Sequence, residues 1–137
     1  MNRKELQDLS NIRLREAKAL LGLGLHDGAY YLAGYAVECA LKACIAKSTR
    51  KYEFPDKKKV DSSYSHSLRE LLRVAGLDEA RDEAAMLDAE FRENWRIVQS
   101  WSEQSRYRRH RPDAARELLD AIMSPRSGVA RWIKRHW

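Results

Sequence analysis

One segment of this 137-residue chain constrains the fold more than any other, the stretch from about Asp27 or Gly28 to Lys47. It is expected to form a single helix, yet its apolar residues surround almost the whole circumference and not just one stripe. These residues are Tyr30, Tyr31, Leu32, Ala33, Tyr35, Ala36, Val37, Ala40, Leu41, Ala43, Cys44 and Ile45. A helix of this kind is central to a bundle, or faces the bundle on one side and a partner subunit on the other.

The rest of the chain supplies helices to surround this one and no convincing strands. Apolar residues recur at helical spacing, and caps or glycines mark most of the ends. The predicted segments are 3–21, 67–76, 78–102, 112–123 and a short last helix that begins at Ser124-Pro125. The prediction is an all-α, up-and-down bundle of four long or medium helices plus a short C-terminal helix. Residues 1–137 are expected to form one domain, since the length suits a single core and no internal repeat is visible.

Residues 48–64 show no sustained hydrophobic period. They carry Pro55 and three successive lysines, Lys57, Lys58 and Lys59, which predict a long exposed loop. Long structureless connections in compact domains tend to be functional or mobile. This loop is therefore a secondary candidate for contact with a partner.

The two cysteines, Cys39 and Cys44, lie on the same predicted helix, five residues apart. At 1.5 Å per residue they are separated by about 7.5 Å along the axis. That exceeds the roughly 7 Å over which a disulfide can form. We expect two buried thiols in a reducing compartment. With no Cys-x-x-Cys motif and four scattered histidines, we expect no metal site, and nothing in the sequence implies a cofactor.

The net charge of +6 is unevenly distributed. Residues 1–60 carry a net +5, residues 61–105 a net −5 and residues 106–137 a net +6. The acidic block could pair with the basic blocks inside the fold or form half of a self-complementary dimer surface. Four arginines crowd into residues 106–111, so this run is either a solvated surface strip or a site for an anionic partner. No apolar run approaches the roughly 18 residues of a membrane span, and we expect a cytoplasmic protein.

Other polar and aromatic residues have ordinary structural interpretations. Glu38 and Lys42 are spaced i to i+4 with the acid first, which favours a helix-surface pair over a catalytic role. His66, at the start of a helix, is interpreted as a hydrogen-bonding turn residue. Trp95 and Trp101 fall in an apolar stripe and are assigned to the core.

Several patterns, in this order, resemble a HEPN domain (higher eukaryotes and prokaryotes nucleotide-binding). The second helix carries Ala36-x-Glu38-x-Ala40-Leu41-Lys42-Ala43, the third opens with His66-Ser67-Leu68, and Ser105-Arg106-Tyr107 precedes the last long helix. The tail from Gly128 to Lys134, with Asn94-Trp95 and Trp101-Ser102-Glu103, is similar to small stand-alone bacterial members. The resemblance implies a helical bundle that dimerises.

Many HEPN domains are metal-independent ribonucleases of toxin-antitoxin and other defence systems, often encoded beside a nucleotidyltransferase antitoxin. In active members an Arg and a His, with four to six residues between them, meet their symmetry mates across the dimer. The resemblance points to Arg106 and His110, which have three residues between them, with Tyr107 where a small polar residue is common. Arg131 and His136 have four, but lie past the helix that carries the motif and rank lower.

Two hypotheses follow. In the first, a homodimer binds RNA, another nucleic acid or a nucleotide, or a partner protein, with Arg106, Arg108, Arg109 and Arg111 contacting phosphates and Lys57, Lys58 and Lys59 adding charge. In the second, a ribonuclease toxin uses His110 as acid and base and Arg106 as the cation that stabilises the transition state. A nucleotidyltransferase antitoxin is a candidate partner in either case.

Overall fold

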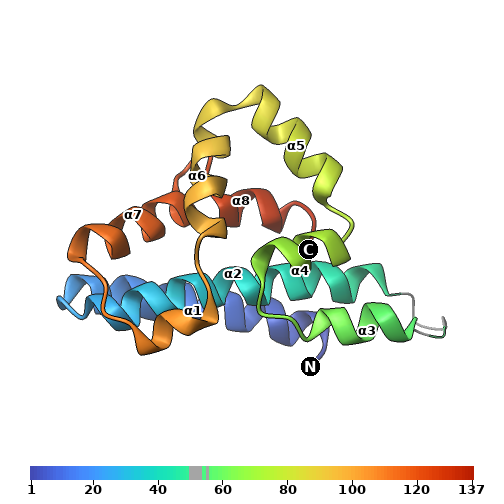
Figure 1. The fold of residues 1–137 in the computed structure, drawn as a ribbon, viewed down its shortest axis with the longest axis horizontal. Coiled ribbons are helices and arrows are strands. Elements are labelled where there is room, and N and C mark those ends of the chain that lie inside the picture. Colours follow the sequence, from blue (N-terminus) through green and yellow to red (C-terminus); the bar gives the residue numbers. More distant parts are fainter. Residues whose placement is uncertain (50–53, 55) are drawn as a thin grey trace.

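The computed structural model describes residues 1–49, 54 and 56–137, and every regular element in that part of the chain is a helix (Figure 1). The elements are α1 (Arg3–Gly22), α2 (His26–Ser48), α3 (Lys57–Ser63), α4 (Leu68–Val74), α5 (Asp78–Leu87), α6 (Ala89–Gln99), the 3₁₀ helix η1 (Glu103–Tyr107), α7 (Pro112–Met123) and α8 (Val129–Lys134). The all-α class is confirmed. The described residues contain more helices than the six predicted segments.

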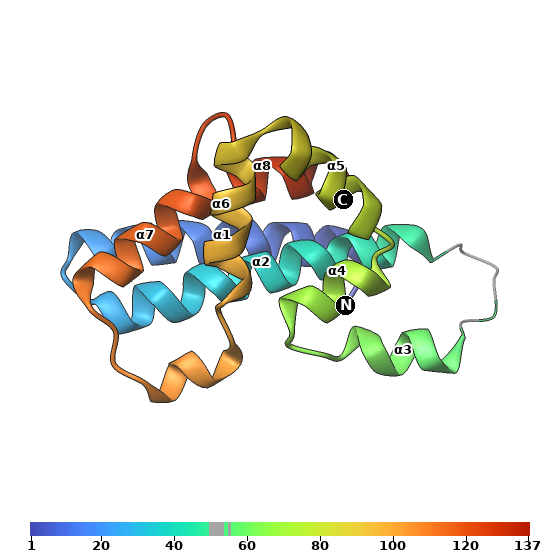
Figure 2. The ribbon, with the colours of Figure 1, turned by 45° about the horizontal axis from the view of Figure 1, so that its top comes forward.

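Helix α2 lies at the centre of the bundle. It packs along α1 and also contacts α4, η1, α7 and α8 (Figures 1 and 2). Twelve of its residues are buried, including Ala33, Val37 and Leu41, which are 2% exposed or less. The chain's own elements thus cover much of its apolar circumference, and Tyr30, Tyr31, Leu32 and Tyr35 remain partly exposed. The central position of this helix is confirmed.

Local sequence signals explain several helix ends. Asn2 and Glu5 form a reciprocal capping box at the start of α1. Ser67 accepts from the backbone N–H of Glu70 and caps α4, as its spacing predicts. Pro112 occupies the first turn of α7, where its missing N–H costs nothing.

Two predicted segments differ from the structure. Lys57–Ser63, assigned to a loop, forms α3, because the Asp56 side chain accepts from the backbone N–H of Lys58 and caps a short helix. The segment predicted as one helix from Asp78 to Ser102 divides at Asp88, which has extended backbone angles. The Asp88 carboxylate accepts from the backbone N–H groups of Glu90 and Phe91 and starts α6.

The last helix also starts later than predicted. Its N-cap is Gly128 and not Ser124, and the chain turns through residues 124–127 first. A Cβ on Gly128 would lie 2.4 Å from the Ser124 carbonyl oxygen. The turn therefore depends on the absence of a side chain at this position.

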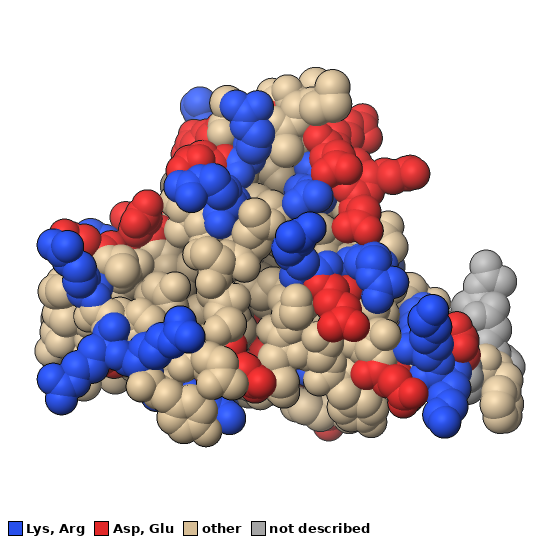
Figure 3. All heavy atoms as spheres, viewed as in Figure 1, with Lys and Arg blue, Asp and Glu red and all other residues tan. Residues whose placement is uncertain are grey.

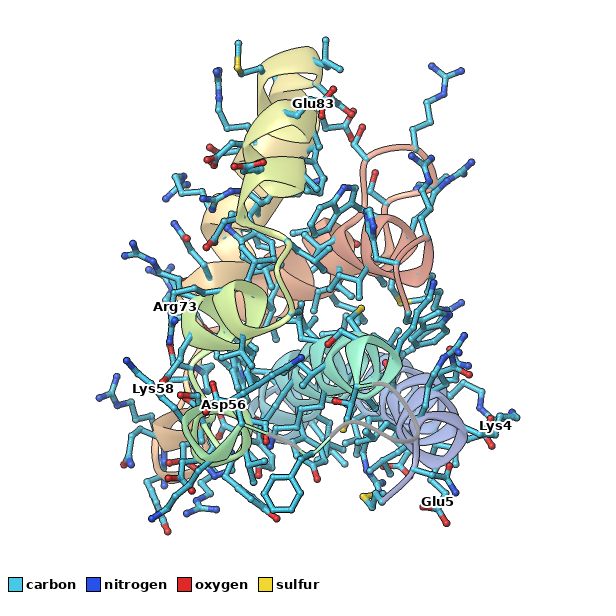
Figure 4. All side chains as sticks on the ribbon, turned by 90° about the vertical axis from the view of Figure 1, so that its right-hand side faces the viewer. Lys4, Glu5, Asp56, Lys58, Arg73 and Glu83 are labelled. Carbon is cyan, nitrogen blue, oxygen red and sulfur yellow. The ribbon has the colours of Figure 1, made fainter. Side chains whose placement is uncertain are left out.

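Helix α5 projects from the bundle as an arm (Figure 1). None of its residues is buried. Figure 4 shows Glu83 at the outer end of this arm, far from Lys4 and Glu5 of α1. On another side of the molecule, η1 and α3 both lie along α2 (Figure 2).

Trp101 fixes the chain that leads into η1. Trp101 is 3% exposed, and its indole covers Gly34 of α2 so closely that a Cβ on Gly34 would lie 2.2 Å from the ring. Tyr31 stacks beside it, with ring centroids 6.1 Å apart. Trp95 is also 3% exposed, so both tryptophans belong to the core as predicted.

The two thiols are buried and unpaired, as predicted from their spacing. Burial raises the pKa of Cys39 and of Cys44 to about 11. Among the described residues, no helix combines the length and the apolar character needed to cross a bilayer.

Candidate functional site

The basic run lies on η1 and on the extended segment between η1 and α7. Arg106 is in η1, and Arg108, Arg109 and Arg111 follow it before Pro112 starts α7. All four side chains are exposed. Figure 3 shows Lys and Arg side chains gathered over these elements at the lower left, whereas Asp and Glu gather on α5 at the upper right.

The acidic block supplies no ion-pair partners to the lysines and arginines of the basic blocks within residues 1–49, 54 and 56–137. The four arginines of the run have no ion-pair partner among these residues either. Their guanidinium groups face solvent without an internal anion.

His110 is held by contacts within the fold. Its ring stacks on Tyr30 with centroids 3.8 Å apart, and its Nε2 lies 3.1 Å from the Ser105 carbonyl oxygen. Its backbone N–H donates to the Asp27 carboxylate at the start of α2. A hollow of about 250 Å³ lies beside it, between residue 110 and the turn at residues 24–28. These contacts attach the basic segment to α2.

Arg106 has different neighbours. Its guanidinium lies over the Tyr107 ring, 4.8 Å from the centroid. The pKa of Arg106 is raised, first by its interaction with Tyr107 and more weakly by Tyr31 and Glu103. The two residues of the predicted catalytic pair, Arg106 and His110, therefore lie on one segment but contact different tyrosines.

The two residues of the lower-ranked pair near the C-terminus, Arg131 and His136, also contact different groups. Arg131 donates to the Pro125 carbonyl oxygen. His136 packs against Trp132, with centroids 4.9 Å apart, and burial lowers its pKa, with Lys47 and Arg135 adding to the effect.

The predicted lysine cluster lies on α3. Lys57 and Lys58 are exposed, and the Nζ of Lys59 donates to Ser48 Oγ at 2.9 Å. Figure 4 shows Lys58 beside Asp56, the residue that caps this helix. The structure thus places two exposed lysine side chains and one partly engaged one on α3, on the same side of α2 as η1 (Figure 2).

A buried ionic network beside η1 was missed by sequence reasoning. Glu38 pairs with Lys42, as the spacing predicts. Its assignment to the helix surface is wrong, because Glu38 is 2% exposed. Its Oε1 lies 3.0 Å from Lys42 Nζ and 2.8 Å from His66 Nδ1. His66 Nε2 lies 3.3 Å from Glu103 Oε2 in η1. We name Glu38, Lys42, His66 and Glu103 the Glu38 network.

The Glu38 network joins three parts of the chain. Glu38 and Lys42 come from α2, His66 from the connection between α3 and α4, and Glu103 from η1. The other oxygen of Glu38, Oε2, is buried and has no hydrogen-bond partner among the described residues. Leaving a buried acceptor unpaired costs about 1–3 kcal/mol. This cost offsets part of what the contacts with Lys42 and His66 contribute to stability.

A family model for the HEPN domain matches residues 5–134. The chain belongs to the HEPN domain family. Comparisons with curated proteins and with solved structures find no match. The HEPN model thus covers nearly the whole sequence, and the described residues agree with it in being all-helical.

The patterns that suggested a HEPN domain converge in space. Glu38 and Lys42 belong to the pattern on α2, and His66 belongs to the pattern that opens α4. The contact between Glu38 and His66 joins residues 28 positions apart and had no local signal in the sequence. Glu103 belongs to the Trp101-Ser102-Glu103 pattern, but its contact with His66 was not predicted, because the sequence did not predict a 3₁₀ helix there.

Proposed function

We propose that this HEPN domain binds RNA or a nucleotide through phosphate contacts made by Arg106, Arg108, Arg109 and Arg111. One observation carries the proposal. Four exposed guanidinium groups lie within six residues, without an ion-pair partner among the described residues. Arginine presents planar donors that match phosphate oxygens in pairs, so this surface suits a phosphate backbone.

The surroundings of the arginines favour single-stranded RNA. Tyr107 is 73% exposed, and a tyrosine beside arginines offers a face on which a base can stack. The backbone under the run is held by Trp101 and His110. A segment fixed in this way loses little conformational freedom when it binds a ligand.

We also propose that the protein acts as a homodimer in a toxin-antitoxin or other defence system, with a nucleotidyltransferase as candidate partner. Leu23 and Leu25 are 74% and 53% exposed, in the turn beside His110. They offer apolar area for a second copy. A monomeric mass by light scattering at tens of micromolar would contradict the dimer.

The alternative is a metal-independent ribonuclease that uses Arg106 and His110. His110 would have to present a ring nitrogen to the RNA 2′-hydroxyl while its ring stacks on Tyr30 and its Nε2 bonds Ser105. This geometry supports binding over cleavage by that pair. Incubation of labelled RNA with EDTA tests the alternative. Intact RNA would overturn it, and cleavage lost in both Arg106→Gln and His110→Asn would support it.

Binding is tested by fluorescence anisotropy with a labelled 12-nucleotide single-stranded RNA. Four phosphate contacts predict that affinity falls about 50-fold between 50 and 200 mM salt. The double variant Arg108→Gln/Arg109→Gln should lower the salt slope by roughly 1.4. Arg92→Gln/Arg126→Gln is the matched control, since both of its arginines are exposed and lie outside the run. Equal losses in the two double variants would contradict a specific role for the run.

A further inference from the structure

His66 lies between two carboxylates and contacts them through different ring nitrogens. Its Nδ1 lies 2.8 Å from Glu38 Oε1, and an ionised carboxylate only accepts, so Nδ1 donates to Glu38. Its Nε2 lies 3.3 Å from Glu103 Oε2. The Glu38 contact is a directed hydrogen bond, whereas the Glu103 contact is a close approach only. His66 is therefore held firmly on the Glu38 side and weakly on the Glu103 side.

Arg106 lies on the same side of η1 as Glu103. A 3₁₀ helix has three residues per turn, so side chains at i and i+3 are in line, with a rise of about 6 Å between them. Glu103 and Arg106 have this spacing in η1, and Glu103 is one of the groups that raise the pKa of Arg106. Glu103 therefore lies near two cationic side chains. His66 Nε2 is 3.3 Å from its carboxylate, and the Arg106 guanidinium is one 3₁₀ turn further along η1 and does not pair with it directly in the described structure.

We propose that His66 and Arg106 form a binding site for a phosphate group of RNA or a nucleotide, and that the Glu103 carboxylate fills this site when the ligand is absent. This inference rests on the proposed function, because it requires that Arg106 contacts phosphate. It adds a site that the basic run does not include, since His66 comes from a different part of the chain. Glu103 acts there as an internal competitor of the ligand.

The four residues of the Glu38 network differ in how far they are buried. Glu38 is almost completely buried, and Lys42 keeps 22% of its side chain exposed. His66 and Glu103 are more accessible, with 47% and 31% of their side chains exposed. The buried pair fixes the ring from the Nδ1 side, and the Nε2 side is open to exchange. A carboxylate on a 3₁₀ helix of five residues can leave this contact without disturbing a long element.

The flanking aromatic rings suit a nucleotide. Tyr31 stacks with Tyr35 at a centroid distance of 6.1 Å and is one of the groups that raise the pKa of Arg106. Tyr107 lies under the Arg106 guanidinium. A phosphate held by Arg106 would bring the attached base close to these rings, where stacking is favourable with any base.

The test compares two carboxylate variants of the full chain. Glu103→Gln removes the competitor, and Glu93→Gln removes an equal charge from an exposed α6 carboxylate that pairs with Arg96. Kd for the labelled 12-nucleotide RNA is measured by anisotropy at 50 mM salt. One charge-assisted hydrogen bond corresponds to about a tenfold change in Kd, so Glu103→Gln should bind roughly tenfold more tightly than Glu93→Gln. His66→Asn should bind roughly tenfold more weakly than wild type.

A second measurement uses the wild-type protein, so it does not require any variant to fold. The ring-proton resonances of His66 in the wild-type protein are followed by NMR during titration with the RNA or with AMP. They should move with either probe if a terminal phosphate suffices, and with RNA alone if the site needs a phosphodiester.

The outcomes separate this inference from the proposed function. Equal Kd values for Glu103→Gln and Glu93→Gln, with His66 resonances that stay fixed while RNA binds, would overturn the inference and leave RNA binding intact. No RNA binding by wild type or by Glu103→Gln would overturn both. Binding by Glu103→Gln alone would support the inference and show that the competitor controls access.

Discussion

The basic run and the Glu38 network meet at η1 but are built in opposite ways. The run, Arg106 to Arg111, keeps four guanidinium groups in solvent without an internal carboxylate in the described structure. The Glu38 network buries a carboxylate to 2% exposure and surrounds it with a lysine and a histidine. The run leaves its charges available to a ligand, whereas the Glu38 network uses its charges in contacts within the fold.

This difference indicates what each region contributes. Exposed charges are solvated whether or not a ligand is present, so keeping them costs little and removing them should affect binding alone. Buried charges lose water on folding and are stable only with their partners in place. The network should therefore control stability and the position of η1, while the run should control affinity.

Loss of Glu38 should have the largest effect. Glu38→Ala leaves Lys42 and His66 without their shared acceptor, and breaking a buried ion pair costs 3–5 kcal/mol. Because both partners keep some exposure, we expect a loss of about 3 kcal/mol in the free energy of unfolding, measured by urea denaturation. Glu93→Ala, on the exposed face of α6, is the control and should unfold near the wild-type midpoint. Equal midpoints for the two variants would contradict the contrast.

An added methyl group at Gly34 should have the next largest effect. In Gly34→Ala the Cβ would lie 2.2 Å from the Trp101 ring, which is rigid and buried, so the indole must move. Overpacking of this kind typically costs 1–3 kcal/mol, and we expect about 2 kcal/mol by urea denaturation.

Gly22→Ala is the matched control for Gly34→Ala, because no atom lies within 4 Å of its added Cβ. Since Trp101 leads into η1, Gly34→Ala should also weaken RNA binding, and Gly22→Ala should not. A Gly34→Ala variant as stable as Gly22→Ala would show that Trp101 does not anchor η1.

A smaller effect should appear at alkaline pH. Burial raises the pKa of Cys39 and Cys44 to about 11, whereas an unfolded thiol has a pKa of about 8.5. Between these values the unfolded chain releases its thiol protons first, so the free energy of unfolding should fall as pH rises from about 8.5 to 11.

Below pH 8 both thiols are protonated in the folded and unfolded chain, so they should not affect the pH dependence of stability. The double variant Cys39→Ala/Cys44→Ala should have a flatter stability curve between about pH 8.5 and 11 than wild type, when both are measured by urea denaturation. Parallel curves for the two proteins would show that other groups cause the alkaline loss.

The sequence predicted those parts of the fold that depend on local chemistry. Helical spacing and caps gave α1, α2, α4 and α7 close to their observed bounds, because the information lies within each segment. The division at Asp88 was missed because the apolar stripe continues across it. A single aspartate that caps α6 and also accepts from Ser127 interrupts the helix there. That last contact joins residues 39 positions apart and has no local signal.

The candidate site shows the same limit. The basic run was visible as four arginines in six residues, and its exposure agrees with that prediction. The burial of Glu38 was not visible, since an i to i+4 pair with Lys42 looks the same on a solvated helix face. Burial is decided by η1 and by the segment that carries His66, which pack on this side of α2 only in the folded chain.

The smallest expected effect on stability is that of removing two arginines of the basic run. Arg108→Gln/Arg109→Gln removes two exposed charges that have no ion-pair partner among the described residues, so the urea midpoint should stay at the wild-type value. The remaining arginines of the run should repel each other less, so any small shift should be toward greater stability, and largest at low salt. Urea denaturation at 20 and 200 mM salt measures this. A clear loss of stability at both salt concentrations would show that the run holds the fold together, and its charges would then not be free for a ligand.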